Sequence, residues 1–242
     1  MKPLISVVIP AYNEEKYVGH TIQRLKEQDF EDDLYEVVIV DNNSSDKTAQ
    51  VATKLGVKVV EYNKTQGVSG ARQAGVEAAQ GEIIAFTDAD TLPPKNWLSG
   101  IARAMDDEKV IIVGGKILPY GAGAFVRFLF NLYDLVVFLN TNLGKPMFWG
   151  NNFATRRWAI EGIGGFNIKL STSEDWDLTG RIKRKYGREY KIVYKSNLVA
   201  ETSNRKQQNT GVFLRYIWQG TMSYINVVLL GRAKSGKIVS VR

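Results

Sequence analysis

The sequence predicts an α/β protein with a mostly parallel central sheet flanked by helices. Short apolar runs rich in Val and Ile, which is the pattern of buried strands, alternate with amphipathic stretches of helical period. Polar clusters with Asn, Asp or Gly follow most of these runs and end them. The length of 242 residues and the 44% hydrophobic content suffice for one domain with a sizeable core and a small appendage.

The first half of the chain contains four predicted buried strands, at residues 5–9, 36–40, 57–61 and 83–86. Helices are predicted between them. Asn13 is an N-cap for a helix that runs to about Glu27, and the polar turn at residues 42–46 caps a helix over residues 47–55. A third helix covers residues 70–79. Strands that alternate with helices in this way form parallel sheets.

The second half is less regular. Strands are predicted at residues 111–117 and 191–194, and residues 152–157 return to the sheet. Ser173 is the N-cap of a predicted helix that ends at Tyr186. We assign residues 1–210 to the main domain and residues 211–242 to a C-terminal amphipathic helix and basic tail.

Two apolar segments, residues 125–139 and 212–230, have the pattern of amphipathic helices. The polar side chains of the first fall on one helical face, and basic residues follow the second. Such helices can lie in the interface of an anionic membrane, but they equally suit packing on a sheet or a dimer interface. No apolar run reaches the roughly 18 uninterrupted residues of a spanning helix, so any membrane contact is expected to be peripheral.

Composition excludes several kinds of site. The chain has no cysteine and a single histidine, His20, predicted to be solvated on a helix surface. Thiolate metal sites, Cys nucleophiles, Ser–His–Asp triads and His-rich zinc sites are therefore not expected, and acid–base chemistry falls to carboxylates, Lys or Tyr. The lack of cysteine and of a signal-peptide core fits a cytoplasmic protein, which would meet a membrane at its inner face.

The net charge of +7 predicts an anionic partner. Nucleoside diphosphates and acidic lipid headgroups are favoured, because no nucleic-acid-binding motif is present. A nucleic-acid binder, the reading from charge alone, would show oligonucleotide affinity that falls steeply with salt.

Polar clusters follow three of the predicted strands: residues 12–14, 41–43 and 88–90. Ligands of parallel sheets bind beyond the carboxyl ends of the strands, so these clusters should converge on one crevice. Within the last cluster, Asp88 and Asp90 can ligate Mg²⁺ or Mn²⁺, and the cation would then neutralise a diphosphate. The alternative is an acidic turn that caps the following segment.

A second acidic cluster, Glu174-Asp175-Trp176-Asp177, opens a predicted helix. Carboxylates are favoured there by the helix dipole alone. The functional alternative is a general base that deprotonates an acceptor hydroxyl, since histidine and cysteine are excluded from that role.

Six motifs, in their order and spacing, resemble those of family-2 glycosyltransferases, a group of inverting enzymes with the GT-A fold. They read VVIPAYNEE from residue 7, VDNNSSDKT from 40, GVSGAR from 67, DAD from 88, GGF from 164 and EDWDL from 174, and their order and spacing match the family along about residues 4–205. The resemblance implies transfer of a sugar from a UDP- or GDP-sugar to a glycan or lipid-linked acceptor.

The resemblance also implies roles for individual residues. The nucleoside pocket would be lined by Pro10, Ala11, Tyr12 and Glu14, with Asp41 bonded to the base. Arg72 and Asp88 would lie near the donor, and Asp90 would hold the metal. Asp175 would be the catalytic base, with Glu174 beside it. The segment under the sugar and the acceptor would be Trp149, Gly150, Asn151 and Asn152; core packing is the alternative for Trp149.

The chain departs from the family pattern at one position. Many relatives place a histidine after the second acidic cluster as a further metal ligand, and here Glu201 stands in that place. Either Asp88, Asp90 and Glu201 surround an Mn²⁺ or Mg²⁺ ion, or Asp90 holds it with the donor diphosphate alone. Arg205 either reaches a phosphate or is a solvated basic residue.

The implied mechanism is a metal-assisted single displacement that inverts the anomeric carbon, with Asp175 as the base. A sugar nucleotidyltransferase is an alternative, but the first strand is not followed by the Gly-rich basic loop of that class. A non-catalytic module that binds a nucleotide or a glycan is the other. Donor turnover in the presence of an acceptor separates these classes.

Overall fold

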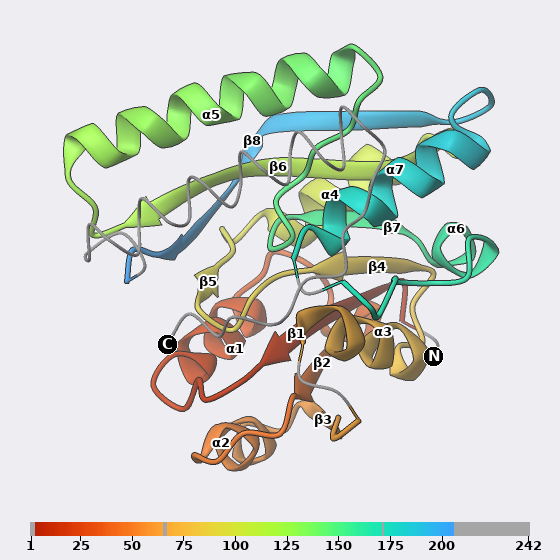
Figure 1. Cartoon of the computed structure of the whole chain (residues 1–242). Helices are drawn as coiled ribbons and strands as arrows, with labels where there is room; N and C mark the ends of the chain where they lie inside the picture. Colours follow the sequence, from red (N-terminus) through yellow and green to blue (C-terminus); the bar gives the residue numbers. More distant parts are fainter. Residues whose placement is uncertain (1–2, 65–66, 171, 206–242) are drawn as a thin grey trace.

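Figure 1 shows the computed structural model, which describes residues 3–64, 67–170 and 172–205. The predicted helix at residues 212–230, and the whole segment 211–242, lie outside these ranges. The described chain forms one sheet with helices on both faces (Figure 1).

The sheet has the strand order β3 (Lys58–Glu61), β2 (Tyr35–Asp41), β1 (Ile5–Ala11), β4 (Ile83–Phe86), β7 (Phe153–Arg156), β6 (Val110–Tyr120), β8 (Lys191–Ser203), β5 (Thr91–Leu92). Strands β1 to β4 are parallel, as predicted. The short β7 runs antiparallel between β4 and β6, β8 is parallel to β6, and β5 is antiparallel to β8. The carboxyl ends of β1, β2 and β4 therefore share one edge of the sheet.

Two hydrophobic cores lie on opposite faces of the sheet, and alternate side chains of β1 enter them. Ile5, Val7 and Ile9 pack in one core, and Val8 packs in the other, as expected for a strand that is covered on both sides. The first core is covered by α1 (Val18–Lys26), α2 (Thr48–Lys54) and α4 (Trp97–Met105). The second is covered by α3 (Val68–Ala78), α6 (Arg157–Gly162) and α7 (Glu174–Tyr186).

The remaining α-helix of the described chain, α5 (Ala124–Asn142), lies along β6 and β8 at the top of Figure 1. It confirms the predicted apolar helix at residues 125–139. A short 3-10 helix, η1 (Asp32–Leu34), precedes β2.

The first helix begins later than predicted. Asn13 is not its N-cap: the residue has a φ of 55°, and α1 begins at Val18 after Tyr17. The Asn13 side chain instead accepts a hydrogen bond from the Ser45 backbone N–H at 2.8 Å. Asn adopts the left-handed conformation more readily than most residues and competes for local backbone donors. The turn at residues 42–46 does cap α2, because Asp46 accepts from the Thr48 N–H at 2.9 Å.

The second half also departs from the predicted ranges. The strand predicted at residues 191–194 extends to Ser203, because β8 continues alongside β6 past an irregularity at Gly115/Lys116. Ser173 does precede α7, but it has a φ of 60° and its side chain makes no capping hydrogen bond. Helix α4 was not predicted, although Trp97, Ile101 and Met105 have helical spacing and are buried.

Asn152 connects three parts of the fold. Its side chain accepts a hydrogen bond from the Trp97 indole at 2.8 Å, and donates to the carbonyls of Lys116 at 2.7 Å and Leu198 at 2.9 Å. The residue is 1% exposed. It fixes the start of β7 against α4, β6 and β8.

We expect Asn152→Ala to lower the free energy of unfolding by about 3 kcal/mol, because three buried groups lose their partner. Urea unfolding measures the change. Asn142→Ala is the control, since that exposed amide bonds only to Phe138 in its own helix, and should change stability by about 0.5 kcal/mol or less. Equal losses in the two variants would contradict the structural role of Asn152.

Candidate active site

The loops that follow β1 and β2 are joined by hydrogen bonds at the shared edge of the sheet. The Asn13 N–H donates to Ser44 Oγ at 3.0 Å, and the Glu14 N–H donates to Thr48 Oγ1 at 2.7 Å. The Glu15 N–H bonds to Asp46 at 3.1 Å. The convergence predicted for these two clusters is confirmed, and it is held by local polar groups.

The residues predicted for a nucleoside pocket lie on adjacent strand ends. Ala11 pairs with Asp41 in the β1–β2 register, and Pro10 pairs with Val40. Tyr12 is 39% exposed, whereas Asp41 is 8% exposed. The Oδ1 atom of Asp41 is buried without a hydrogen-bond partner among the described residues. A buried acceptor without a partner carries a desolvation cost, which a ligand N–H would remove.

Arg72, on α3, is the centre of the site. It is 3% exposed and forms ion pairs with Glu174 on α7 and, at 3.0 Å, with Asp88 after β4. Burial alone would lower the pKa of Arg72, but the charges of Glu174, Asp88 and Asp175 raise it above its ordinary value. The guanidinium therefore stays charged and connects both acidic clusters that the sequence singled out.

Asp175 and the Arg72 guanidinium both lie against Gly150. A Cβ atom at Gly150 would come within 2.8 Å of both Arg72 Nη2 and Asp175 Oδ2, so the absent side chain leaves room for the two groups. Burial raises the pKa of Asp175 to about 7, and the neighbouring Glu174 charge adds to the rise. Arg72 and the Trp176 N–H, at 2.8 Å, oppose it. A carboxyl group with this pKa can exchange a proton near neutral pH.

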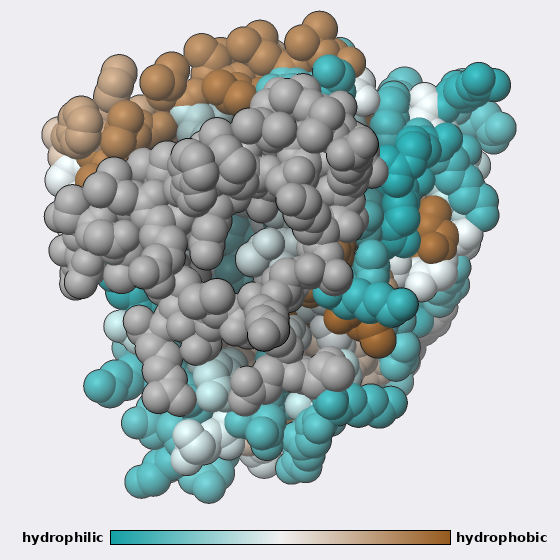
Figure 2. Space-filling model, viewed as in Figure 1, coloured by the Kyte–Doolittle hydropathy of each residue, from teal (hydrophilic) through white to brown (hydrophobic). Residues whose placement is uncertain are grey.

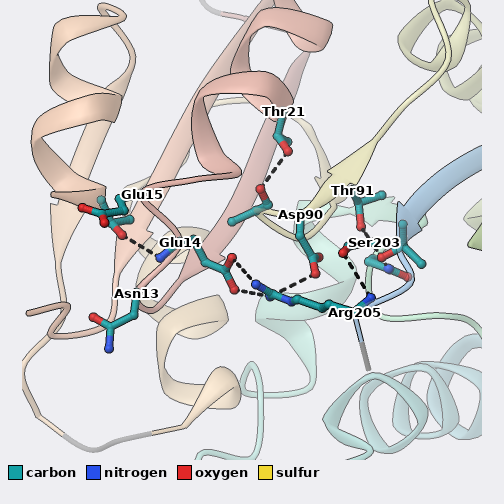
Figure 3. Close-up of polar contacts among 12 residues, drawn as sticks. Asn13, Glu14, Glu15, Thr21, Asp90, Thr91, Ser203 and Arg205 are labelled. Carbon is teal, nitrogen blue, oxygen red and sulfur yellow. Dashed lines mark hydrogen bonds and ion pairs between the residues drawn. The ribbon is translucent and has the colours of Figure 1, made fainter. Parts of the chain in front are cut away.

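Arg205 bridges two carboxylates from distant parts of the chain (Figure 3). Its guanidinium bonds to both carboxylate oxygens of Glu14, at 2.8 Å from Nη1 to Oε2, and lies 3.0 Å from Asp90 Oδ2. It also lies 4.8 Å from the centre of the Tyr17 ring. Burial lowers the pKa of Arg205, but Glu14 and Asp90 raise it above its ordinary value. Arg205 is therefore not a solvated surface residue.

The acidic turn is further supported from both sides. Thr21 of α1 donates to the Ala89 carbonyl at 2.8 Å, and the Ser203 N–H donates to the Asp90 carbonyl at 3.0 Å (Figure 3). Tyr17 and Ser203 were not identified from the sequence, because neither lies in a motif and both reach the site only through tertiary contacts.

The predicted metal ligands each have a defined place. Asp88 pairs with Arg72 and Asp90 with Arg205, while Glu201 lies in β8 opposite Leu92 of β5. Within residues 3–64, 67–170 and 172–205, no three Asp, Glu or His side chains are grouped closely enough to hold a cation. The hard oxygen donors of Asp88 and Asp90 suit Mg²⁺ or Mn²⁺ chemically. The arrangement fits a cation held by the acidic turn together with ligand oxygens better than one held by three carboxylates.

The predicted acceptor segment divides into two parts. Trp149 stacks on Phe130 of α5, with ring centres 5.7 Å apart, and contacts Tyr133 at 4.7 Å. Its indole nitrogen is buried without a hydrogen-bond partner among the described residues. Asn151 donates to Thr91 Oγ1 at 3.1 Å. Asn152 lies behind this surface, and its amide is committed to the structural contacts described above.

A polar cluster at the ends of β1 and β2 and an acidic turn after β4, which Arg72 connects to the second acidic cluster, are the features of nucleotide-diphospho-sugar transferases with the GT-A fold. The model of glycosyl transferase family 2 matches residues 6–164. The chain belongs to this family, and the resemblance seen in its motifs is confirmed.

Individual relatives agree with this assignment. Glycosyltransferase AglE of Haloferax volcanii is 29% identical over 189 residues, which cover 74% of this chain and 61% of the relative. Beta-monoglucosyldiacylglycerol synthase of Trichormus variabilis is 30% identical over 198 residues, covering 74% of this chain and 41% of that protein. The chain thus spans less than two thirds of the length of these relatives.

A solved structure supports the fold. Mannosyltransferase PcManGT from Pyrobaculum calidifontis, in complex with GDP-Man and Mn²⁺, superimposes with a TM-score of 0.75 at 22% identity. The match covers 98% of this chain and 66% of that one.

We expect Glu174→Gln to lower the pKa of Asp175 below about 7. The substitution removes a negative neighbour and releases Arg72 from its ion pair, and both changes favour the charged carboxylate. Carbon-13 NMR of the carboxyl groups measures the titration. Glu161→Gln, on the exposed end of α6, is the control and should leave the titration unchanged. A pKa of Asp175 that stays constant or rises in Glu174→Gln would show that the Glu174 charge does not act on it.

Proposed function

We propose that this chain is an inverting glycosyltransferase, which transfers a sugar from a UDP- or GDP-sugar to a hydroxyl group of a glycan or lipid-linked acceptor with a divalent cation. The observation that carries the proposal is the position of Asp175. It is a half-buried carboxyl group with a pKa of about 7, held beside Arg72, which itself pairs with the acidic turn. The Arg72 side chain therefore connects the proposed base, Asp175, to the acidic turn on the donor side of the site.

The donor nucleoside is assigned to the ends of β1 and β2. The unpartnered Asp41 Oδ1 would accept the imide N–H of uracil or the ring N–H of guanine. Pro10, Ala11 and the exposed ring of Tyr12 supply the apolar wall that a base needs. These features support a nucleotide and leave both bases open.

A cation is expected from the charge balance. The described side chains around the site carry more carboxylates (Glu14, Asp88, Asp90, Glu174, Asp175) than guanidiniums (Arg72, Arg205). The excess carboxylates would repel a diphosphate that enters the site. Mg²⁺ or Mn²⁺ held by Asp90 and Asp88 would neutralise the leaving diphosphate. The PcManGT structure is a complex with GDP-Man and Mn²⁺, which supports this assignment. Glu201 remains a third candidate ligand.

The residues of the chain then perform one displacement. Asp175 takes the proton of the acceptor hydroxyl, and the oxygen attacks the anomeric carbon as the bond to the diphosphate oxygen breaks. Attack from the face opposite the leaving group inverts that carbon. Arg72 orients both acidic clusters, and Arg205 would exchange Asp90 for a donor phosphate once a cation neutralises that carboxylate. Trp149, Gly150 and Asn151 lie under the sugar and acceptor, with Asn152 holding that segment in place.

Nucleotide binding is the first expected outcome. UDP or GDP with Mn²⁺ at saturating concentration should raise the melting temperature by about 5 °C or more, because ligand binding stabilises the native state by mass action. Asp41→Asn should weaken the effect of the nucleotide, and Asp90→Asn should remove its dependence on metal. Asp107→Asn, at an exposed ion pair with Lys191, is the control. If no nucleotide raises the melting temperature, the proposed donor site is wrong.

Catalysis is tested separately. Asp175→Asn should lower kcat by about a thousandfold while nucleotide binding persists, because it removes only the base. In the wild type, the rate should fall as the pH drops below about 7, where Asp175 becomes protonated. Turnover is followed by release of the nucleoside diphosphate. Undiminished transfer by Asp175→Asn to a hydroxyl acceptor would exclude Asp175 as the base.

A further inference from the structure

The outer face of α5 is an unusual surface for a helix packed on a sheet. Figure 2 shows a hydrophobic band along the top of the molecule, where α5 lies in Figure 1. Its large apolar side chains are exposed by 42% to 77%: Phe125, Phe128, Leu132, Leu135, Phe138, Leu139 and, just past the helix end, Leu143. Contiguous apolar surface of this kind marks an interaction site.

The inner face of α5 is firmly attached to the protein. Phe130, Val137 and Thr141 are buried against the sheet. Asp134 accepts a hydrogen bond from the Tyr194 hydroxyl and lies 3.7 Å from Lys116 Nζ. In the described part of the chain, α5 is the one helix with the length and hydropathy to cross a membrane. The contacts of Asp134 with Tyr194 and Lys116 instead hold α5 along the sheet, so that only its outer face is available to lipid.

The same helix contacts the acceptor side of the site. Phe130 and Tyr133 pack on Trp149, and Trp149 is followed by Gly150, whose missing side chain leaves room for Arg72 and Asp175. Only the thickness of α5 therefore lies between its outer apolar face and the segment assigned to the acceptor.

The charges near this face favour an anionic lipid surface over a second copy of the chain. The exposed apolar face includes no charged side chain of α5, because Arg127 is directed to the Pro119 carbonyl and Asp134 to the sheet. Exposed lysines flank it: Lys145 bonds to Asn140 through its N–H, and Lys195 follows Tyr194, whose ring contacts Phe138. A symmetric dimer through α5 would bring these lysines toward their counterparts, whereas anionic headgroups would neutralise them.

We propose that the outer face of α5 is a membrane-contacting surface, which binds an anionic bilayer and sets the acceptor side of the site against it. The acceptor is then a molecule carried on a lipid. This inference rests on the proposed function for the acceptor, and the name of one relative, beta-monoglucosyldiacylglycerol synthase, agrees with it. A cytoplasmic enzyme meets such anionic lipid at the inner face of the membrane.

Flotation with phosphatidylcholine vesicles, with and without phosphatidylglycerol, tests the surface. The full chain should float with the anionic vesicles and float less with neutral ones. The double variant Phe128→Glu/Leu132→Glu should bind at least roughly tenfold more weakly, since it places charges in the apolar face. Ile168→Glu is the matched control, because Ile168 is 52% exposed and Leu132 is 51% exposed. It should float like the wild type.

Two further measurements keep the result interpretable. Thermal unfolding must show that the double variant folds; should it fail, Leu135→Gln replaces it. Sedimentation of the wild type and the variant identifies a dimer: a wild-type dimer that dissociates on substitution and does not float overturns the proposal in favour of a second copy. Wild-type protein that stays at the bottom also overturns it. Nucleotide stabilisation without flotation leaves the proposed function intact and rejects only the membrane surface; flotation without nucleotide binding rejects only the donor site.

Discussion

The buried guanidinium of Arg72 is the interaction on which the arrangement of the site depends. It joins α3 to the turn after β4 and, through Glu174, to the start of α7, which lies 102 residues further along the chain. A buried charge is costly unless it is paired, so these elements are held at a fixed separation. The same guanidinium limits how far the pKa of Asp175 rises. Fold and proton chemistry are thus controlled by one side chain.

The first half of this structure could be predicted from its sequence because its signals are local. Val and Ile runs identify β1, β2 and β4, and the Asp46 cap of α2 follows from one turn. Asp41 ends β2, and Asp88 and Asp90 follow β4, where parallel topology brings them to one edge of the sheet. The departures have long-range causes. Asn13 is diverted from capping by Ser45, and β8 is prolonged by pairing with β6. The partners of Arg205 and the role of Asn152 depend on tertiary contacts that no motif records.

The site is built between two different kinds of surface. Toward β1 and β2 it is polar and held by hydrogen bonds between loops, as suits a charged nucleotide. Toward α5 it is aromatic, with Trp149 between Phe130 and Tyr133. Gly150 lies at the boundary, where any Cβ atom would approach Arg72 and Asp175 too closely. The proposed nucleotide-sugar donor and acceptor would therefore approach from chemically distinct sides and meet at Gly150, where no side chain intervenes.

The Arg205 bridge has a consequence for how the chain acquires its site during synthesis. Glu14 and Arg205 are separated by 191 residues, so Glu14 and Asp90 leave the ribosome long before the Arg205 guanidinium that pairs with both. Until then these two acids lack that partner, although β1, β2 and β4 can already pair. Arg205 can pair with the acidic turn only after residue 205 has been synthesised, and a nascent chain that stops before β8 would have these carboxylates without the Arg205 guanidinium.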